Sequence, residues 1–294
     1  MILDFGYLCM TFRLNLSNSF NFPSHMTAEK SHTYVGGHAA SQAIAAARSG
    51  AKIALIGTIG NDVFGKTILT TLRREGINTS GIAKSDTPTG VIHTLINHEQ
   101  QKAIIFSANA NLESVPDQLP DNMLSERTLI LLQNDMAPDI NKAILKRAKT
   151  RNAYAIMCFS HTENIELTMF DNLDTVILDE NILPKICEQL SIPLETCAQS
   201  LAQKTKTHCI ITKDQGASGA YAINAIGEKH EQGTSKDALT NHADIFDSFC
   251  GTFAACIQAR LPIPKAMQYG VSAATLTAQN NAFPYLGDIE DNLD

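Results

Sequence analysis

Near the C-terminus, Asp247 has the residue type and the surroundings that proton transfer from a hydroxyl requires. It closes the run Asp244-Ile245-Phe246-Asp247 and opens a stretch of apolar and small residues, 248–255, that predicts a helix. A carboxylate at that place can act as a general base, and the first N–H groups of the helix can face an anion. An aspartate at a helix start can also serve only as a cap, so the run leaves both roles open.

Three side chains of kinds that bind metal ions stand close together in the same segment: His242, Asp244 and Asp247. Such a set could hold a divalent cation that activates water, which makes a metal-dependent hydrolase a minor hypothesis. Histidines and aspartates in loops are more often solvated or capping. The sequence contains no HExxH, no Gly-x-Ser-x-Gly and no Walker-type Gly-x4-Gly-Lys-Ser/Thr motif that would point to another centre.

A second segment with chemical potential begins at the paired glycines Gly36 and Gly37, which precede an alanine-rich stretch. Adjacent glycines let a ligand approach the backbone at the positive end of a helix. A tight turn before a helix would explain the pair equally well. Further along, the run 56–65 (IGTIGNDVFG) and the pair Thr89-Gly90 repeat the pattern of glycines beside polar residues.

The elements that would position these residues alternate between short apolar runs and longer helical patterns. We expect buried strands at 52–56, 128–132, 154–159, 175–178 and 209–212. We expect helices at 38–49, 64–75, 139–150, 183–190 and 194–204. This alternation predicts a mostly parallel sheet with helices on both faces.

Two regions interrupt the alternation, at about 8–35 and 89–107. They contain β-prone, half-polar runs at 10–16, 90–96 and 102–106 with no helical pattern between them. We expect these runs to form antiparallel strands of a small separate sheet. No linker composition or internal repeat divides the chain, so we interpret residues 1–294 as one domain with a β appendage.

Taken in order, these motifs resemble those of the ribokinase-like (PfkB-type) carbohydrate kinases. The resemblance runs from the glycine pair and the run 56–65 through Leu132-Gln133-Asn134-Asp135, which matches an acidic position after a strand, to the segment around Asp247. It implies an α/β fold, a three-layer α/β/α sandwich with a small β-sheet lid. It also implies ATP-dependent phosphoryl transfer to a hydroxyl of a sugar or nucleoside, with ATP and Mg²⁺ as cofactors.

The same resemblance assigns roles to individual residues. Asp247 would be the catalytic base, and the turn Asp244, Ile245 and Phe246 would form the anion hole for the phosphates. The residues facing the acceptor would be Thr11, Gly36, Gly37, His38 and Ser41. The residues facing the nucleotide would be Thr212, Gly216 and Gly219.

The chain departs from the family pattern at polar positions of the site. Thr11 stands where the family has an aspartate, and His38 and Ser41 stand where it has lysine and asparagine. The Asn-x-x-Glu element reads Asp179-Glu180-Asn181-Ile182, without its glutamate. These changes remove groups that bind the hydroxyls of a polyol.

The anion hole departs most. The family's Gly-Ala-Gly is replaced by Asp244-Ile245-Phe246. A carboxylate ~4 Å from a phosphate charge costs about 4 kcal/mol at an effective dielectric of about 20, and the bulky Ile245 and Phe246 disfavour a tight turn. We therefore expect ATP chemistry to be weakened or lost. The alternative to a kinase is a catalytically inactive member of the fold that senses a ligand or binds a partner.

Composition limits the class of partner. The 294 residues include 44% hydrophobic and 18% charged residues and carry a formal net charge of −7, which gives no basis for binding nucleic acid or a membrane. The seven cysteines are scattered without a Cys-x-x-Cys motif, so we expect buried reduced thiols in a cytoplasmic protein. Because family members often pair through their lids, we also expect a homodimer.

Overall fold

The computed structural model describes residues 1–16, 25–99, 101–163, 165–234 and 244–293. His242 lies outside these residues, so the metal hypothesis that requires it is not addressed by the structure. Within the described part, no group of three or more His, Cys, Asp or Glu side chains could hold a metal ion. No helix of that part has the length and apolar character needed to span a bilayer.

The main sheet has nine strands in the order β13-β12-β11-β10-β9-β8-β1-β4-β5. The strands are β1 (Ile2–Phe5), β4 (Ile53–Gly60), β5 (Asn78–Ser85), β8 (Leu129–Gln133), β9 (Tyr154–Phe159), β10 (Thr175–Asp179), β11 (His208–Thr212), β12 (Ala220–Ile223) and β13 (Lys229–Gln232). The strands from β11 to β5 are parallel, and β12 and β13 extend the sheet in antiparallel pairing. The expected α/β class is confirmed, because the long apolar runs are the strands buried on both faces.

Helices cover both faces of the sheet. They are α1 (His38–Arg48), α2 (Val63–Arg74), α3 (Pro138–Thr150), α4 (Leu183–Leu190), α5 (Cys197–Thr205), α6 (Ile245–Gln258), α7 (Ile263–Asn280) and α8 (Leu286–Asp291). Short 3₁₀ helices lie at Asn109–Glu113, Pro116–Gln118, Asp121–Met123, Leu167–Phe170, Leu194–Thr196 and Asp214–Gly216. One hydrophobic core joins α1, α2, α6 and α7 to the sheet, and a second joins α3, α4 and α5 to the opposite face.

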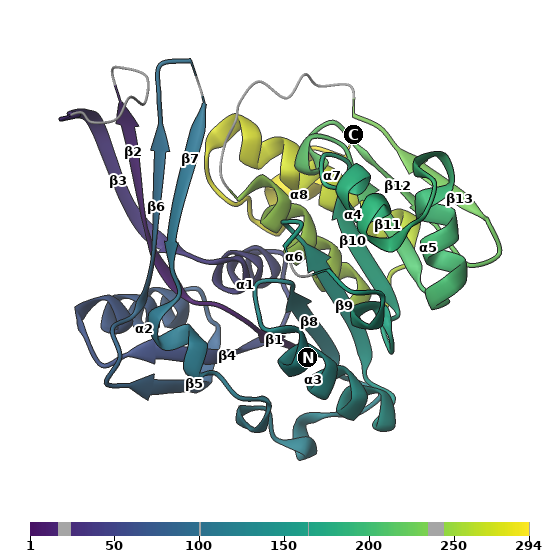
Figure 1. The fold of residues 1–294 in the computed structure, drawn as a ribbon, viewed down its shortest axis with the longest axis horizontal. Coiled ribbons are helices and arrows are strands. Elements are labelled where there is room, and N and C mark those ends of the chain that lie inside the picture. The colour runs from purple at the N-terminus through teal and green to yellow at the C-terminus, as the bar shows by residue number, and fades with distance from the viewer. Residues whose placement is uncertain (17–24, 100, 164, 235–243, 294) are drawn as a thin grey trace.

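A second sheet, which we call the lid, stands apart from the main body (Figure 1). Its order is β3-β2-β6-β7, from β2 (Cys9–Leu16), β3 (Ala28–Gly36), β6 (Gly90–Ile96) and β7 (Lys102–Ser107). The expectation of purely antiparallel strands was wrong, because β2 and β6 pair in parallel. The antiparallel strand β3 returns the chain to the base of the lid, and α1, β4, α2 and β5 follow before β6 starts from that same base.

The shortest connection between the main sheet and the lid is the segment Gly6, Tyr7 and Leu8, between β1 and β2. The buried side chain of Asn111 fixes the last of them: its Oδ1 accepts from the Leu8 amide at 2.8 Å, and its Nδ2 donates to the Leu8 carbonyl at 3.1 Å. The backbone at the base of the lid is therefore held by a side chain from a different segment.

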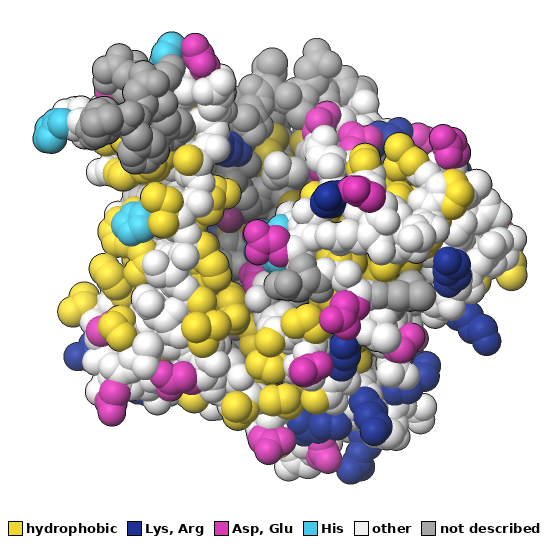
Figure 2. Space-filling view, viewed as in Figure 1, with side chains coloured by type: hydrophobic (Ala, Val, Ile, Leu, Met, Phe, Trp, Pro, Cys, Tyr) yellow, Lys and Arg dark blue, Asp and Glu magenta, His cyan; other side chains and the backbone are white. Residues whose placement is uncertain are grey.

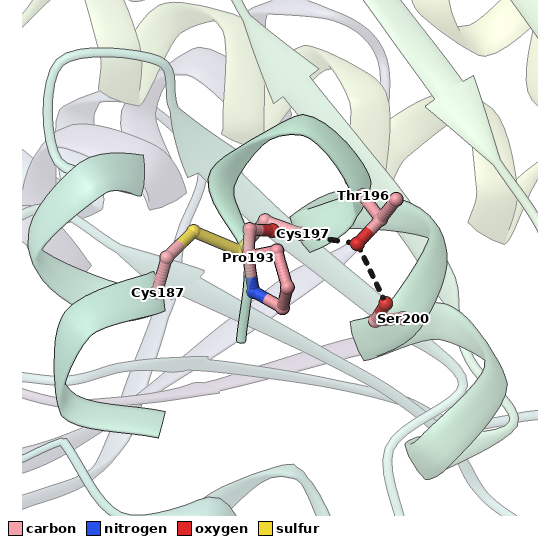
Figure 3. The surroundings of a disulfide bond; sticks show 5 residues. All are labelled: Cys187, Pro193, Thr196, Cys197 and Ser200. Carbon is pink, nitrogen blue, oxygen red and sulfur yellow. Dashed lines mark hydrogen bonds between the residues drawn. A yellow bond between two sulfur atoms is a disulfide. The ribbon is translucent and has the colours of Figure 1, made fainter. Parts of the chain in front are cut away.

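The cysteines differ in part from the expectation of reduced thiols. Cys187 of α4 and Cys197 at the start of α5 form a disulfide (Figure 3). Five cysteines are free and buried: Cys9, Cys158, Cys209, Cys250 and Cys256. The prediction was wrong for one pair, since only the packing of α4 beside the turn at 191–196 brings these two residues together.

Close packing of α1 against α6 positions the polar residues on both helices. A Cβ atom added at Gly251 of α6 would lie 2.3 Å from the carbonyl oxygen of Gln42 and 2.8 Å from the Cβ of Ala45. Glycine and alanine at this crossing bring the two backbones close together, so that side chains one turn away can bridge the helices.

Gly251→Ala should push α6 away from α1 and lower the free energy of unfolding by about 1–3 kcal/mol, because the new methyl group meets backbone that cannot rotate away. Urea denaturation measures the change. Gly287→Ala in α8 is the matched control, since a Cβ there meets no atom within 4 Å. Equal stability of the wild type and Gly251→Ala would contradict this account of the helix contact.

Thiol labelling in denaturant tests the disulfide. Without reductant, five of the seven cysteines should react, and all seven should react after reduction. A Cys187→Ser, Cys197→Ser double variant should give five labels under both conditions. Seven labels on the unreduced wild type would show that the pair is not oxidised.

Candidate functional site

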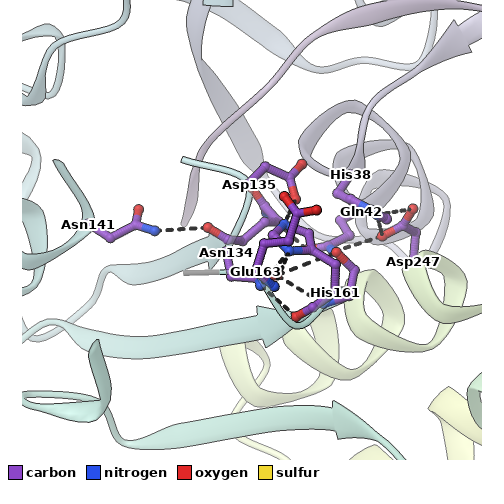
Figure 4. Close-up of polar contacts among 10 residues, drawn as sticks. His38, Gln42, Asn134, Asp135, Asn141, His161, Glu163 and Asp247 are labelled. Carbon is purple, nitrogen blue, oxygen red and sulfur yellow. Dashed lines mark hydrogen bonds and ion pairs between the residues drawn. The ribbon is translucent and has the colours of Figure 1, made fainter. Parts of the chain in front are cut away.

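Three segments meet at the carboxyl ends of the central parallel strands: the start of α1, the start of α6 and the end of β8 (Figure 4). In an open α/β sheet this edge is where ligands bind. Gly36 ends β3 and Gly37 precedes α1, so the lid leads directly into the helix that carries His38 and Gln42.

The centre of the site is the carboxylate of Asp247, which is 3% exposed. Its two oxygens lie 2.9 and 3.0 Å from Nδ1 of His38, and Oδ1 also accepts a hydrogen bond from Nε2 of Gln42 at 2.8 Å. His38 and Gln42 are four residues apart on α1 and therefore share one face of the helix. The sequence prediction missed Gln42, although this spacing from His38 is the signal that could have identified it.

His38 is a cation in this arrangement. Burial lowers the pKa of His38, but the negative charges of Asp247, Asp135 and Asp244 and the hydrogen bond to Asp247 together raise it to about 10. Because the imidazole is 35% exposed, solvent screens part of these interactions. The pKa of His38 is raised despite this screening, so His38 and Asp247 form an ion pair around neutral pH.

Asp135 supplies a second carboxylate beside the pair. Burial raises its pKa, yet the charges of His38 and His161 and the nearby Ser160 lower it below the ordinary value. Oδ1 of Asp135 lies 3.6 Å from Nε2 of His161. His161 was not predicted, because nothing in its local sequence indicates that the loop after β9 reaches Asp135.

Asp244 adopts a left-handed conformation, with φ 74°, immediately before α6. Aspartate and asparagine tolerate this conformation better than other residues with a side chain. The expectation that Ile245 and Phe246 would disfavour the turn was wrong: only Asp244 needs a positive φ, and the other two residues are helical with side chains buried in the core.

The carboxylate of Asp244 is turned toward α1 and the lid. Oδ1 accepts a hydrogen bond from Oγ of Ser41 at 3.2 Å, and the hydroxyl of Tyr34 on β3 forms another. Burial and the nearby charge of Asp247 raise the pKa of Asp244 to about 6, against the opposing effects of His38, Ser41 and Tyr34. Asp244 thus joins the lid, α1 and α6.

The backbone at the start of α6 can still receive an anion. As in any helix, the first N–H groups have no carbonyl partner inside the helix, and they carry the positive end of its dipole. The side chains of Ile245 and Phe246 are only 4% and 6% exposed, so they do not cover those groups from the solvent side. The obstacle that remains is the negative charge of Asp244.

The other residues predicted to face the acceptor lie where backbone segments approach one another closely at the base of the lid. Thr11 is buried on β2 opposite Tyr34, and its Oγ1 would be 2.3 Å from a Cβ placed on Gly36. Gly37 has φ 87°, and a Cβ there would lie 2.5 Å from the Tyr7 carbonyl oxygen. Both glycines are therefore required for β3 to turn into α1.

The predicted nucleotide residues lie at the end of β11 and in the turn that follows it, which packs against Phe249 of α6. Gly216 has φ 102°, and its Cβ position is 2.9 Å from the ring of Phe249. Gly219 has φ 113° beside the Gln232 carbonyl. The buried hydroxyl of Thr212 donates to Oδ2 of Asp179 at 2.9 Å, which makes Thr212 part of the turn that follows β10 and β11.

Residues 1–282 match the model of the pfkB family of carbohydrate kinases, and the chain belongs to that family. A ribokinase of Lactococcus lactis is 25% identical, over 88% of this chain and 85% of its own length. A 5-dehydro-2-deoxygluconokinase of Geobacillus thermodenitrificans is also 25% identical, over 98% of this chain and 92% of its own.

Solved structures show the same fold. The ribokinase of Thermotoga maritima matches with a TM-score of 0.89 at 23% identity, covering 99% of this chain and 98% of that one. The ribokinase of Arabidopsis thaliana in complex with ribose and ATP matches with a TM-score of 0.86 at 18% identity, covering 100% and 98%. The chain therefore has the ribokinase-like α/β fold.

Asp244→Asn should change the pH dependence of stability. The pKa of Asp244 rises from 3.8 to about 6 on folding, so the folded state keeps this proton to higher pH than the unfolded state. The contribution of Asp244 to the stability of the wild type therefore falls as pH rises from about 4 to about 6. The asparagine variant lacks this loss and should be about 1–3 kcal/mol more stable at neutral pH, with no gain below about pH 4.

Urea denaturation at a series of pH values measures this effect. Asparagine also tolerates a positive φ, so the backbone of the variant is not strained. Asp139→Asn, whose side chain is 98% exposed, should show no such difference. A constant gap between wild type and Asp244→Asn across the range would assign the effect to something other than titration.

Proposed function

We propose that this chain transfers the γ-phosphate of ATP to a hydroxyl group of a sugar or a nucleoside. The observation that carries the proposal is the position of Asp247, a buried carboxylate in the first turn of α6 beside N–H groups that can face a phosphate. General base and phosphate site then lie at one helix start, as transfer to a hydroxyl requires. The kinases among its relatives support the same reaction class.

In this proposal Asp247 accepts the proton of the acceptor hydroxyl while the α6 amides stabilise charge on the phosphoryl group. Thr212, Gly216 and Gly219 line the nucleotide flank, and Thr11, Gly36, Gly37, His38 and Ser41 form the acceptor side. Mg²⁺ supplies neutralisation of phosphate charge.

His38 affects the base directly. Nδ1 of His38 lies 2.9 Å from the Asp247 carboxylate and holds it in place. The imidazolium can also donate to an oxygen of the acceptor or of the phosphoryl group from its other ring nitrogen. The proposal therefore assigns His38 to orientation and charge stabilisation, and proton removal to Asp247.

A second candidate function is binding without catalysis, as a ligand sensor or a partner-binding protein. One observation favours it: the carboxylate of Asp244 occupies the first position of the anion-hole turn, next to the ion pair of His38 and Asp247. Both features oppose phosphate binding and proton transfer. A protein with this fold and no turnover could use the residues between α1 and α6 to bind an uncharged ligand.

The remaining proposals concern the whole molecule. We take residues 1–294 as one ribokinase-like domain with its lid, in a cytoplasmic protein whose partner is a small molecule rather than nucleic acid or a membrane. We also propose a homodimer through the lid. Ile104, Ile105 and Phe106 of β7 are 66%, 55% and 46% exposed, and hydrophobic side chains gather over the lid strands (Figure 2). Exposed apolar residues on an edge strand favour pairing.

Calorimetric titration with Mg-ATP, followed by a screen of sugars and nucleosides for ADP release, tests the function. For an acceptor that is phosphorylated, Asp247→Asn should lower kcat about 10²–10⁴-fold, because the amide cannot take the proton, and leave the affinity for Mg-ATP within about threefold. Asp139→Asn should match the wild type. Nucleotide binding without turnover on any acceptor, or no nucleotide binding at all, would favour the second candidate.

A further inference from the structure

Asp4 is a carboxylic acid in the interior of the main sheet. It lies on the central strand β1 and is 0% exposed. Side chains alternate along β1: Ile2 belongs to the core beneath α1 and α6, while Leu3 and Phe5 belong to the opposite core. Asp4 therefore faces α1 and α6, the helices that carry the site, and a buried carboxyl group at such a position needs an explanation.

A chain of side-chain hydrogen bonds connects Asp4 to the base. Nε2 of Gln133, at the end of β8, donates to Oδ1 of Asp4 at 2.8 Å and to Oε1 of Gln42 at 3.0 Å. Nε2 of Gln42 then donates to Oδ1 of Asp247 at 2.8 Å. All four side chains are buried, with exposures of 0–2%. Water therefore does not compete for these bonds.

The orientation of each amide in this chain is defined. Gln133 donates from Nε2 to both of its neighbours, Asp4 and Gln42, and its Oε1 makes no hydrogen bond to a described residue. Gln42 accepts on Oε1 and donates from Nε2 to Asp247. If Gln133 turned over, its oxygen would face the oxygen of Gln42. Gln42 would then turn over as well and present its oxygen to the Asp247 carboxylate, which is a repulsive contact. An acceptor at the far end of the chain keeps Gln133 in the favourable orientation.

We propose that Asp4 is a positioning residue for the base: through Gln133 and Gln42 it keeps the amide nitrogen of Gln42 directed at Asp247. This inference rests on the proposed function, in which Asp247 takes the acceptor proton. A hydrogen bond to the ionised carboxylate stabilises that form and fixes which oxygen remains for the acceptor.

The charge state of Asp4 is consistent with this role. Burial raises its pKa well above the ordinary value, against the hydrogen bond from Gln133, and the charges of Asp247 and Asp135 raise it further. This direction favours the protonated form of Asp4. Its Oδ1 accepts from Gln133, and Oδ2 makes no hydrogen bond to a described residue.

The test compares a neutral isostere with an apolar residue at the same position. Asp4→Asn keeps an accepting oxygen and replaces O–H by N–H, whereas Asp4→Leu removes the acceptor. Hydrogen exchange of the Gln42 side-chain amide, followed by NMR and assigned by its loss in Gln42→Leu, reports the bond to Asp247 without nucleotide or acceptor. Exchange should become at least about tenfold faster in Asp4→Leu and stay within about twofold of wild type in Asp4→Asn.

Controls separate positioning from general loss of stability. Leu3→Val weakens the same strand from the other core and should leave the Gln42 exchange rate unchanged relative to backbone amides of β1 and β8. If Asp4→Leu does not fold, Gln133→Met interrupts the chain one residue further on with nearly the same side-chain shape. Unchanged exchange of the Gln42 side-chain amide in the folded Asp4→Leu or Gln133→Met variant would overturn the proposal. The proposal would also fail if Asp4→Asn and Leu3→Val accelerated this exchange as much as Asp4→Leu does.

Kinetics give a second reading where an acceptor is phosphorylated. The groups facing Asp247 are His38, Asp244 and Asp135 in addition to Gln42, so the profile is compared in variants that leave them intact. The low-pH limb of kcat/KM should move up by about one pH unit in Asp4→Leu, because Asp247 loses its donor, and not in Asp4→Asn. A protein without kinase activity would fail this reading alone, while the exchange experiment would still decide the role of Asp4.

Discussion

The contact between α1 and α6 is the constraint on which the site depends. Where the helices cross, the backbone of Gln42 occupies the space that any side chain at position 251 would need. Only at that separation can His38 and Gln42, on one helix, both reach Asp247 on the other. The polar site is therefore a product of tight apolar packing: glycine and alanine set the distance, and the hydrogen bonds follow from it.

Close to this contact, the turn before α6 differs from the family pattern in its residues. A turn that family members build from glycines is here built with an aspartate, and its carboxylate bonds to Ser41 and Tyr34 instead of leaving open space. The positive φ survives because aspartate accepts it. At this turn the positive φ needs no glycine, and the aspartate that adopts it adds a carboxylate to the start of α6.

Sequence patterns predicted the helices and strands in which buried residues recur at the spacing of that element. The apolar run 154–159 predicted β9 with its bounds, and 183–190 did the same for α4. Patterns failed where the outcome depends on pairing between distant segments. The parallel pairing of β2 with β6, the disulfide of Cys187 with Cys197 and the approach of His161 to Asp135 all arise from the folded chain. The hydrogen-bonded side chains that lead from Asp4 to Asp247 were not predicted, because a lone acidic residue in an apolar strand carries no periodic signal.

The clamp of Asn111 on Leu8 determines how the lid can move. Both backbone groups of Leu8 are held, and Gly6 packs so closely on Gln133 that a Cβ there would lie 2.1 Å from its side-chain oxygen. The start of β2, which we call its root, is therefore held by Asn111 and Gln133. Any movement of the lid would therefore have to come from bending of β2 and β6 beyond that root. The greatest travel then belongs to the strand ends farthest from the base, and the least to the residues around Asp247.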